Sequence, residues 1–139
     1  MKRKFFLVLF SLLVLFSSIC SVNAFDETTR EDFAINSRYT GVYSYFAAIS
    51  AGSPGSATCS ASAHLKSGYR LSGTMYLYKE GYPVSIASWS VSGSSHVSIS
   101  RNHSVVSGNT YYVRFEGDIY DSNDNCVDSI SCDSQHQSF

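Results

Sequence analysis

Apolar and polar residues alternate with a period of two along most of the chain after residue 39. In Ser56–Leu65 every odd position is apolar and every even position is polar, and Leu71–Tyr78 and Thr110–Tyr120 follow the same rhythm. His96–Ser100 is a shorter run of the same kind, and no window of the chain carries a convincing helical stripe. Because alternate side chains of a β-strand point to opposite faces, these segments are predicted to be strands with one buried and one exposed face.

Three further segments are predicted to be strands with a less regular pattern. Tyr39–Ile49 is apolar on both faces, and Cys126–Cys132 places its two cysteines on one face. Val84–Val91 changes phase part-way, which a β-bulge near Ala87-Ser88 would explain. The seven short strands predict an all-β fold over residues 39–133, an antiparallel seven-stranded β-sandwich, with a closed small barrel as the alternative architecture.

One corner of the predicted fold resembles a known family. Residues 107–115 read Ser-Gly-Asn-Thr-Tyr-Tyr-Val-Arg-Phe. This segment resembles the corner and the following strand of fibronectin type III and related immunoglobulin-like domains. The resemblance implies that the hydroxyl of Tyr111 returns to the backbone of the turn, and it favours an immunoglobulin/fibronectin III-like sandwich.

The chain is also similar to small exported proteins of unknown function from low-GC Gram-positive bacteria. The similarity covers residues 36–120 and rests on the start Asn36-Ser37-Arg38-Tyr39-Thr40-Gly41, a Ser/Ala-rich second strand, Trp89 and the Gly-x-x-Tyr corner. The resemblance implies export. It transfers no catalytic residues, because the function of that family is unknown.

The first 24 residues are predicted to be a signal peptide. A basic cap, Lys2-Arg3-Lys4, precedes an apolar run from Phe5 to Phe16, and Val22 and Ala24 occupy the −3 and −1 positions of a cleavage site. The apolar run is too short for a membrane span, which needs about 20 residues. We therefore expect cleavage after Ala24 and a secreted protein, with a charged N-terminal leader at residues 25–38 and a short C-terminal tail at residues 134–139.

Composition and charge exclude several classes of protein. Charged residues make up only 15% of the 139 residues and aromatic residues 14%, which excludes a disordered chain. Loss of the three basic residues of the signal peptide lowers Lys+Arg from 10 to 7 against 11 acidic residues, a net charge of −4. We therefore expect no nucleic-acid partner and no stable membrane insertion after signal cleavage.

The cysteines give a geometric prediction. Cys126 and Cys132 share one predicted strand and would lie about 20 Å apart, too far for a disulfide. The sandwich topology places Cys59 and Cys132 toward the same end, on the inward faces of opposing sheets. A Cys59–Cys132 disulfide is therefore predicted, with reduced thiols as the alternative, and Cys126 is left as a free or intermolecular thiol.

Metal chemistry finds little support in the sequence. Asp121–Asn125 matches the first half of a calcium loop, but Cys126 occupies the glycine position, so a turn is predicted, with weak cation binding as the alternative. A zinc site would have to be assembled from distant strands, because no two histidines have metal-ligand spacing. The four are His64 and His96, which alternation points to solvent, His103 and His136.

Catalytic patterns are not found either. The serines lie in no Gly-x-Ser-x-Gly elbow, and they are accounted for as the exposed faces of strands. Glu116 and Asp118 share one face of one predicted strand, whereas glycoside hydrolysis needs two acids facing each other across a cleft. We expect no enzyme, no cofactor and no metal.

The most suggestive surface feature is a set of outward-facing tyrosines. Tyr76 and Tyr78 point outward from one predicted strand, and Tyr112 and Arg114 from another that neighbours it in a type III sandwich. Aromatic rings on a flat sheet are a platform for sugar rings or a partner protein, although tyrosine is also a favoured strand residue. We predict an exported, non-enzymatic binding or adhesion module that recognises a cell-wall or host glycan or a surface protein. The alternative is a small secreted effector, such as a toxin, a bacteriocin-like protein or an envelope-associated protein.

Overall fold

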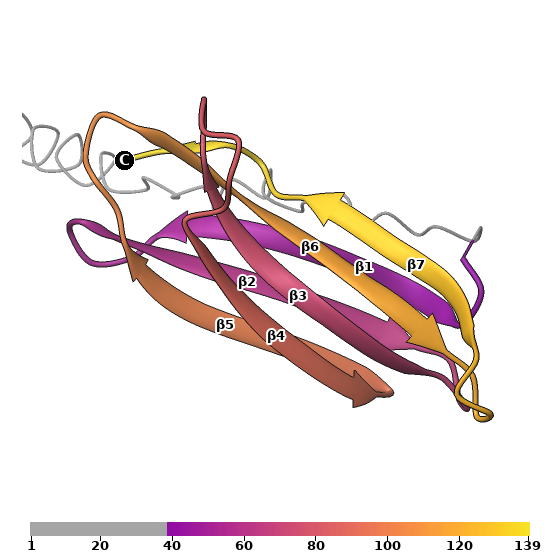
Figure 1. Cartoon of the computed structure of the whole chain (residues 1–139). Helices are drawn as coiled ribbons and strands as arrows, with labels where there is room; N and C mark the ends of the chain where they lie inside the picture. Colours follow the sequence, from indigo (N-terminus) through magenta and orange to yellow (C-terminus); the bar gives the residue numbers. More distant parts are fainter. Residues whose placement is uncertain (1–38) are drawn as a thin grey trace, which may run out of the picture. The chain divides into compact units, whose positions relative to one another are not determined.

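The computed structural model describes residues 39–139, which form an antiparallel all-β fold of two sheets (Figure 1). The first sheet has the order β1-β2-β5 and consists of β1 (Val42–Ala51), β2 (Ser56–Leu65) and β5 (His96–Ser104). The second has the order β4-β3-β6-β7, with β8 also paired to β6, and consists of β3 (Arg70–Lys79), β4 (Ala87–Ser94), β6 (Thr110–Tyr120), β7 (Cys126–Asp133) and β8 (Gln137–Ser138). The predicted signal peptide at 1–24 and the predicted leader at 25–38 lie outside the described residues.

The prediction of an all-β, antiparallel, two-sheet fold is confirmed. The predicted strands Ser56–Leu65 and Thr110–Tyr120 have the same bounds in the structure. One further strand, β8, lies in the segment expected to form only a short C-terminal tail, where Gln137 pairs with Tyr111. Within residues 39–139 there is no helix long and apolar enough to cross a membrane.

The strand β4 begins later than its sequence suggests. It starts at Ala87, and its pairing with β3 runs without a register shift, so the bulge predicted near Ala87-Ser88 is wrong. The change of phase arises because Val84 and Ile86 belong to an exposed loop and not to the strand. The register shifts that do occur lie in the β1–β2 pairing and in the β6–β7 pairing.

The core lies between the inward faces of the two sheets. Alternation places most of the odd-numbered residues of β2, β3 and β6 in it, and the burial of these apolar side chains is the main stabilising term of such a fold. The chain passes from the second sheet to the first at Ser95, a single residue between β4 and β5 whose φ is 69°. The largest fully buried side chains include Phe115, Leu71, Met75, Leu77 and Ile119.

The contact expected between the Tyr111 hydroxyl and the backbone of the preceding turn is present. The Val106 amide donates a hydrogen bond to the hydroxyl oxygen of Tyr111 at 3.0 Å, across the turn between β5 and β6. The Tyr111 ring is buried and meets the Phe139 ring edge to face, with 5.7 Å between the ring centroids. The implied return of this hydroxyl to the backbone of the turn is therefore confirmed.

The predicted Cys59–Cys132 disulfide is wrong, because both sulfurs are free, as is that of Cys126. The prediction failed on the lateral position of the two strands that carry the cysteines. Cys59 is buried on β2, the central strand of its sheet, whereas Cys132 pairs with Phe115 on β7, the outer strand of the other sheet. Because β7 packs against β1, the edge strand of the first sheet, the two cysteines are offset sideways by a strand. A disulfide allows only about 4 Å between Cβ atoms.

Candidate functional site

The predicted tyrosines and arginine do meet on one face of the second sheet. The strands β3 and β6 are neighbours at its centre, with Tyr76 opposite Arg114 and Tyr78 opposite Tyr112. The side chains between them in sequence, including Leu77 and Val113, are fully buried, so the period of two turns these four outward. We call the outward set of Tyr76, Tyr78, Tyr112, Arg114 and His136 the tyrosine face.

Three aromatic rings of the tyrosine face form a column. The rings of Tyr78 and Tyr112 are stacked, with 5.1 Å between centroids and 10° between planes. His136 stacks on Tyr112 at 4.7 Å and 5°. Because β6 lies between β3 and β8, Tyr78 and His136 cover opposite sides of the Tyr112 ring. The rings therefore present their edges and hydroxyls to solvent, and Tyr76, tilted 44° from Tyr78, adds a fourth ring beside the column.

Charged groups border the column along β6 and β7. Arg114 donates to both carboxylate oxygens of Asp133, at 2.6 and 2.7 Å, and its guanidinium lies 5.6 Å from the Tyr78 ring centroid. This hydrogen bonding raises the pKa of Arg114 and lowers the pKa of the Asp133 carboxyl. At the other side of the column, the His136 imidazole lies 3.5 Å from the Glu80 carboxylate.

Sequence reasoning missed three members of this surface: Asp133, His136 and Glu80. Asp133 ends β7 and His136 lies just beyond it, in the segment expected to be a tail. The pairing of β8 with β6 brings His136 over Tyr112, and alternation within a strand cannot reveal a contact made outside it. An Asp facing an Arg on neighbouring strands could have been found only with the strand register in hand.

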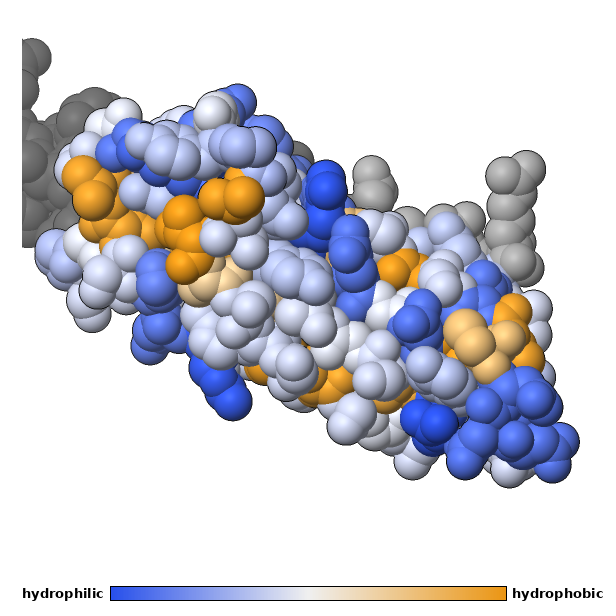
Figure 2. Space-filling view, in the orientation of Figure 1, coloured by the Kyte–Doolittle hydropathy of each residue, from blue (hydrophilic) through white to orange (hydrophobic). Residues whose placement is uncertain are grey.

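Exposed apolar residues lie next to the tyrosine face, in the loop that follows β3. Val84 is 66% exposed and Ile86 is 40% exposed, and Tyr82 of the same loop carries the Lys79 ammonium 4.8 Å from its ring centroid. Figure 2 shows hydrophobic side chains gathered at the end of the sandwich where this loop lies. The aromatic column and this apolar loop together form a mixed surface of the kind seen at binding sites.

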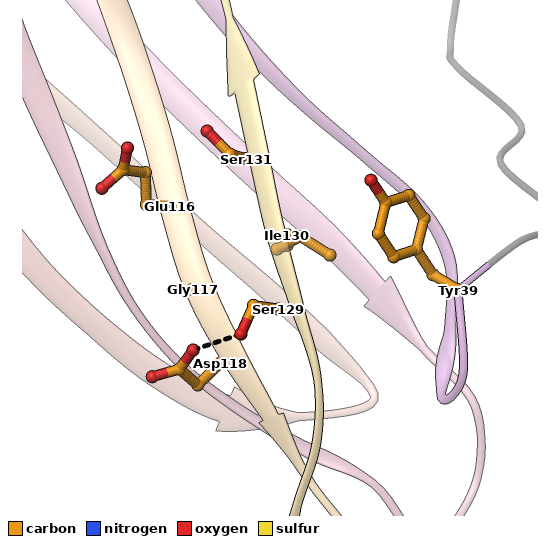
Figure 3. Close-up of a pocket in the computed structure, with 7 residues that line it drawn as sticks. All are labelled: Tyr39, Glu116, Gly117, Asp118, Ser129, Ile130 and Ser131. Carbon is orange, nitrogen blue, oxygen red and sulfur yellow. Dashed lines mark hydrogen bonds between the residues drawn. The ribbon is translucent and has the colours of Figure 1, made fainter.

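A shallow pocket of about 330 Å³ lies along β6 and β7 beside Tyr39. Figure 3 shows Ile130 pointing toward Tyr39, while Glu116 and Asp118 project from β6 on the other side of β7. Asp118 accepts a hydrogen bond from the Ser129 hydroxyl at 2.7 Å. The two carboxylates therefore lie side by side on one strand and do not face each other across the pocket, which is not the arrangement of a glycoside hydrolase.

The segment that resembles half a calcium loop forms a turn. One carboxylate oxygen of Asp121 accepts hydrogen bonds from the amides of Asn123 and Asn125, at 2.8 and 3.0 Å. The bond from Asn125 is the main cause of the lowered pKa of Asp121. Asp124 adopts a positive φ of 62° and pairs with Arg70 at 3.0 Å. Among residues 39–139 no group of three or more His, Cys, Asp or Glu side chains is placed to hold a metal ion.

Comparisons with known proteins do not assign the chain to a family. No protein-family model matches it, and a search of curated proteins finds no match. The geometry of its surfaces therefore carries the functional argument.

Proposed function

We propose that this protein is an exported, non-enzymatic binding or adhesion module that recognises a surface protein or a glycan through the tyrosine face. Export is supported by the basic cap, the short apolar run and the cleavage pattern of residues 1–24, and by the texture shared with small exported proteins of low-GC Gram-positive bacteria. The net charge of −4 expected after signal cleavage disfavours ligands that are recognised through their phosphate groups.

We also propose that the sandwich is of the immunoglobulin/fibronectin III-like type. The strand orders β1-β2-β5 and β4-β3-β6-β7 support this, because they place β3 and β6 at the centre of one sheet. The hydrogen bond between Val106 and the Tyr111 hydroxyl supports it independently, as a tyrosine corner at the start of β6. Domains of this architecture expose a broad sheet face, and here that face carries the tyrosines.

The single observation that carries the functional proposal is the stacked column of Tyr78, Tyr112 and His136 on an exposed sheet face. Stacked rings hold each other in place, so a ligand that contacts them orders few additional side chains. Tyrosine and arginine are also the residue types that contribute most at protein interfaces.

The geometry of the column bears on the kind of ligand. A sugar ring cannot lie flat on Tyr112, because rings cover both sides of it. The exposed edges and hydroxyls suit the mixed polar and apolar contacts of a protein surface. We therefore expect a surface protein to be the stronger ligand, and we expect a glycan to depend on Tyr76.

The test replaces Tyr76, Tyr78 and Tyr112 together with serine. Binding of the purified protein and of the triple variant is measured on peptidoglycan, on a glycan array and on intact cells with and without protease treatment. We expect at least about a tenfold loss of binding in the variant. Tyr43→Ser is the matched control, because Tyr43 is 62% exposed and lies on the other sheet. Equal binding by the triple variant and the wild type, with both folded by circular dichroism, would overturn the proposal.

A second candidate function is a small secreted effector without a sugar ligand. It is favoured by exposed apolar side chains in two loops. Val84 and Ile86 lie in the loop after β3, and Val106, which is 67% exposed, lies in the loop after β5. Such tips can contact a membrane without a spanning segment. Leakage of dye from vesicles, abolished by Val84→Ser and Ile86→Ser but unchanged by the triple tyrosine variant, would favour the effector over the binding module.

A further inference from the structure

The outer face of the first sheet carries a pair of histidines that the sequence places far apart. His64 on β2 and His96 on β5 are direct cross-strand partners, at the end of that antiparallel pairing. Their ring centroids are 4.2 Å apart and the ring planes are tilted by 52°. Both side chains are exposed, as the alternation of their strands predicts. This pair belongs to the other sheet from the tyrosine face.

The surroundings of this pair are neutral and rich in hydroxyls. Ser44 on β1 lies opposite His64, so the row across the sheet is Ser44, His64 and His96. The positively charged residue nearest to His64 along the chain is Lys66, whose ammonium lies 5.8 Å from the Tyr43 ring centroid. The other cross-strand pairs on this side of β2 and β5 are short polar residues without a carboxylate: Ser56 with Ser104, Thr58 with Asn102, Ser60 with Ser100, and Ser62 with Ser98. Ser62 is buried, and Phe46 of β1 lies opposite it.

We propose that His64 and His96 form a two-imidazole binding site for a divalent first-row transition metal ion, with Cu²⁺ bound most tightly. Neutral imidazole is a preferred ligand of Cu²⁺, Ni²⁺ and Zn²⁺, and for a given set of nitrogen ligands the affinity is highest for Cu²⁺. Two ligands leave the remaining coordination positions to water or to a group from a second molecule. The site is therefore an open one, suited to capture or to bridging and not to a closed structural role.

The cross-strand register makes joint coordination possible. Directly opposed residues of an antiparallel pair have Cβ atoms about 5 Å apart, and each metal–nitrogen bond is about 2.0–2.1 Å long. Two imidazole nitrogens about 3–4 Å apart can share one ion. The rings already lie within 4.2 Å of each other between centroids, and their exposure leaves them free to rotate about χ1 and χ2 until one nitrogen of each faces the same point.

The other two histidines are placed differently and serve as controls. His103 meets the Trp89 ring at 6.0 Å, and His136 is stacked on Tyr112 with Glu80 nearby. Neither contacts another histidine among the ring contacts of the described residues. If single surface histidines were sufficient to bind the metal ion, these two would bind as well as His64 and His96.

The experiment is isothermal titration of the purified protein with Cu²⁺ and with Ni²⁺, beside the single variants His64→Ala and His96→Ala and the control variants His103→Ala and His136→Ala. We expect one site, weakened at least about tenfold by either His64→Ala or His96→Ala and unchanged by His103→Ala. A rise of the thermal midpoint with Cu²⁺ in the wild type, absent from the double variant His64→Ala/His96→Ala, is the second readout.

Three results would overturn the inference. They are wild-type binding no tighter than that of His64→Ala or His96→Ala, a loss in His103→Ala equal to the losses in these two variants, and a loss in His136→Ala that matches the loss in His64→Ala. Circular dichroism of each variant shows whether it is folded, and both positions are exposed, so either ring can be removed without opening the core.

Discussion

Arg114 on β6 donates two hydrogen bonds to Asp133 on β7. This pair links the edge strand to the centre of the sheet that carries the tyrosine face. The same guanidinium borders the Tyr78 ring. A single side chain therefore joins two strands and also borders the aromatic column.

Breaking this pair should lower stability modestly and in a pH-dependent way. Asp133→Asn is expected to cost about 0.5–1 kcal/mol, because both side chains are more than a third exposed and solvent screens them. Since the pKa of Asp133 is lowered in the folded state, its contribution is present above the unfolded carboxyl pKa of about 3.9 and is lost as the pH falls through the folded value. Urea unfolding at pH 7 and at acidic pH, for wild type and variant, measures this. A difference that stays constant across the range would contradict it.

The centre of the same sheet has no room for even one methyl group. Gly73 and Gly117 face each other across β3 and β6, and a Cβ at Gly73 would lie 2.7 Å from the Glu116 carbonyl oxygen. Gly73→Ala must therefore push backbone apart, and we expect it to cost about 1–3 kcal/mol. Ser72→Ala is the matched control one residue away, and it should be nearly neutral. Equal urea midpoints for the two variants would contradict the prediction, because they would mean that a methyl group at residue 73 is accommodated without cost.

The corner hydrogen bond can be tested by removing a single oxygen. Tyr111→Phe keeps the buried ring but leaves the Val106 amide without its partner, and we expect a loss of about 0.5–1.5 kcal/mol. Tyr112→Phe, which removes an outward hydroxyl from the next position, is the control. Chemical denaturation of both variants distinguishes a specific corner from a general effect of tyrosine loss.

The thiols should react in a defined order. Cys126 is exposed, whereas burial raises the pKa of Cys59 to about 11 and that of Cys132 to about 12. Because the thiolate is the reactive form, the native protein at pH 8 should be labelled at Cys126 and scarcely at the other two. Mass spectrometry after alkylation, with and without urea, locates the labels. A protected Cys59–Cys132 pair that appears only after reduction would restore the rejected disulfide.

Much of the fold was predictable from the sequence because alternation is a local signal. It located β2 and β6 to the residue, and it turned Tyr76, Tyr78, Tyr112 and Arg114 to one face. The pairing of strands was predictable only through the corner resemblance, which made β3 and β6 neighbours.

The remaining features depend on which strands oppose one another. The Cys59–Cys132 prediction failed because it required β7 to lie over β2, and alternation reports the face of a strand but not its neighbour in the opposing sheet. The stacking of His136 on Tyr112 and the meeting of His64 with His96 are likewise contacts between distant segments. They follow from register, which a single sequence does not contain.

The placement of the two candidate surfaces on different sheets makes the protein two-sided. The sheets of a sandwich are separated by only about 10 Å, and their outward side chains point in opposite directions. A ligand on the tyrosine face would leave the hydroxyl-rich face of β2 and β5 open. If both proposals hold, the two ligands would lie on opposite sides of the sandwich, and neither would compete for the other's contacts.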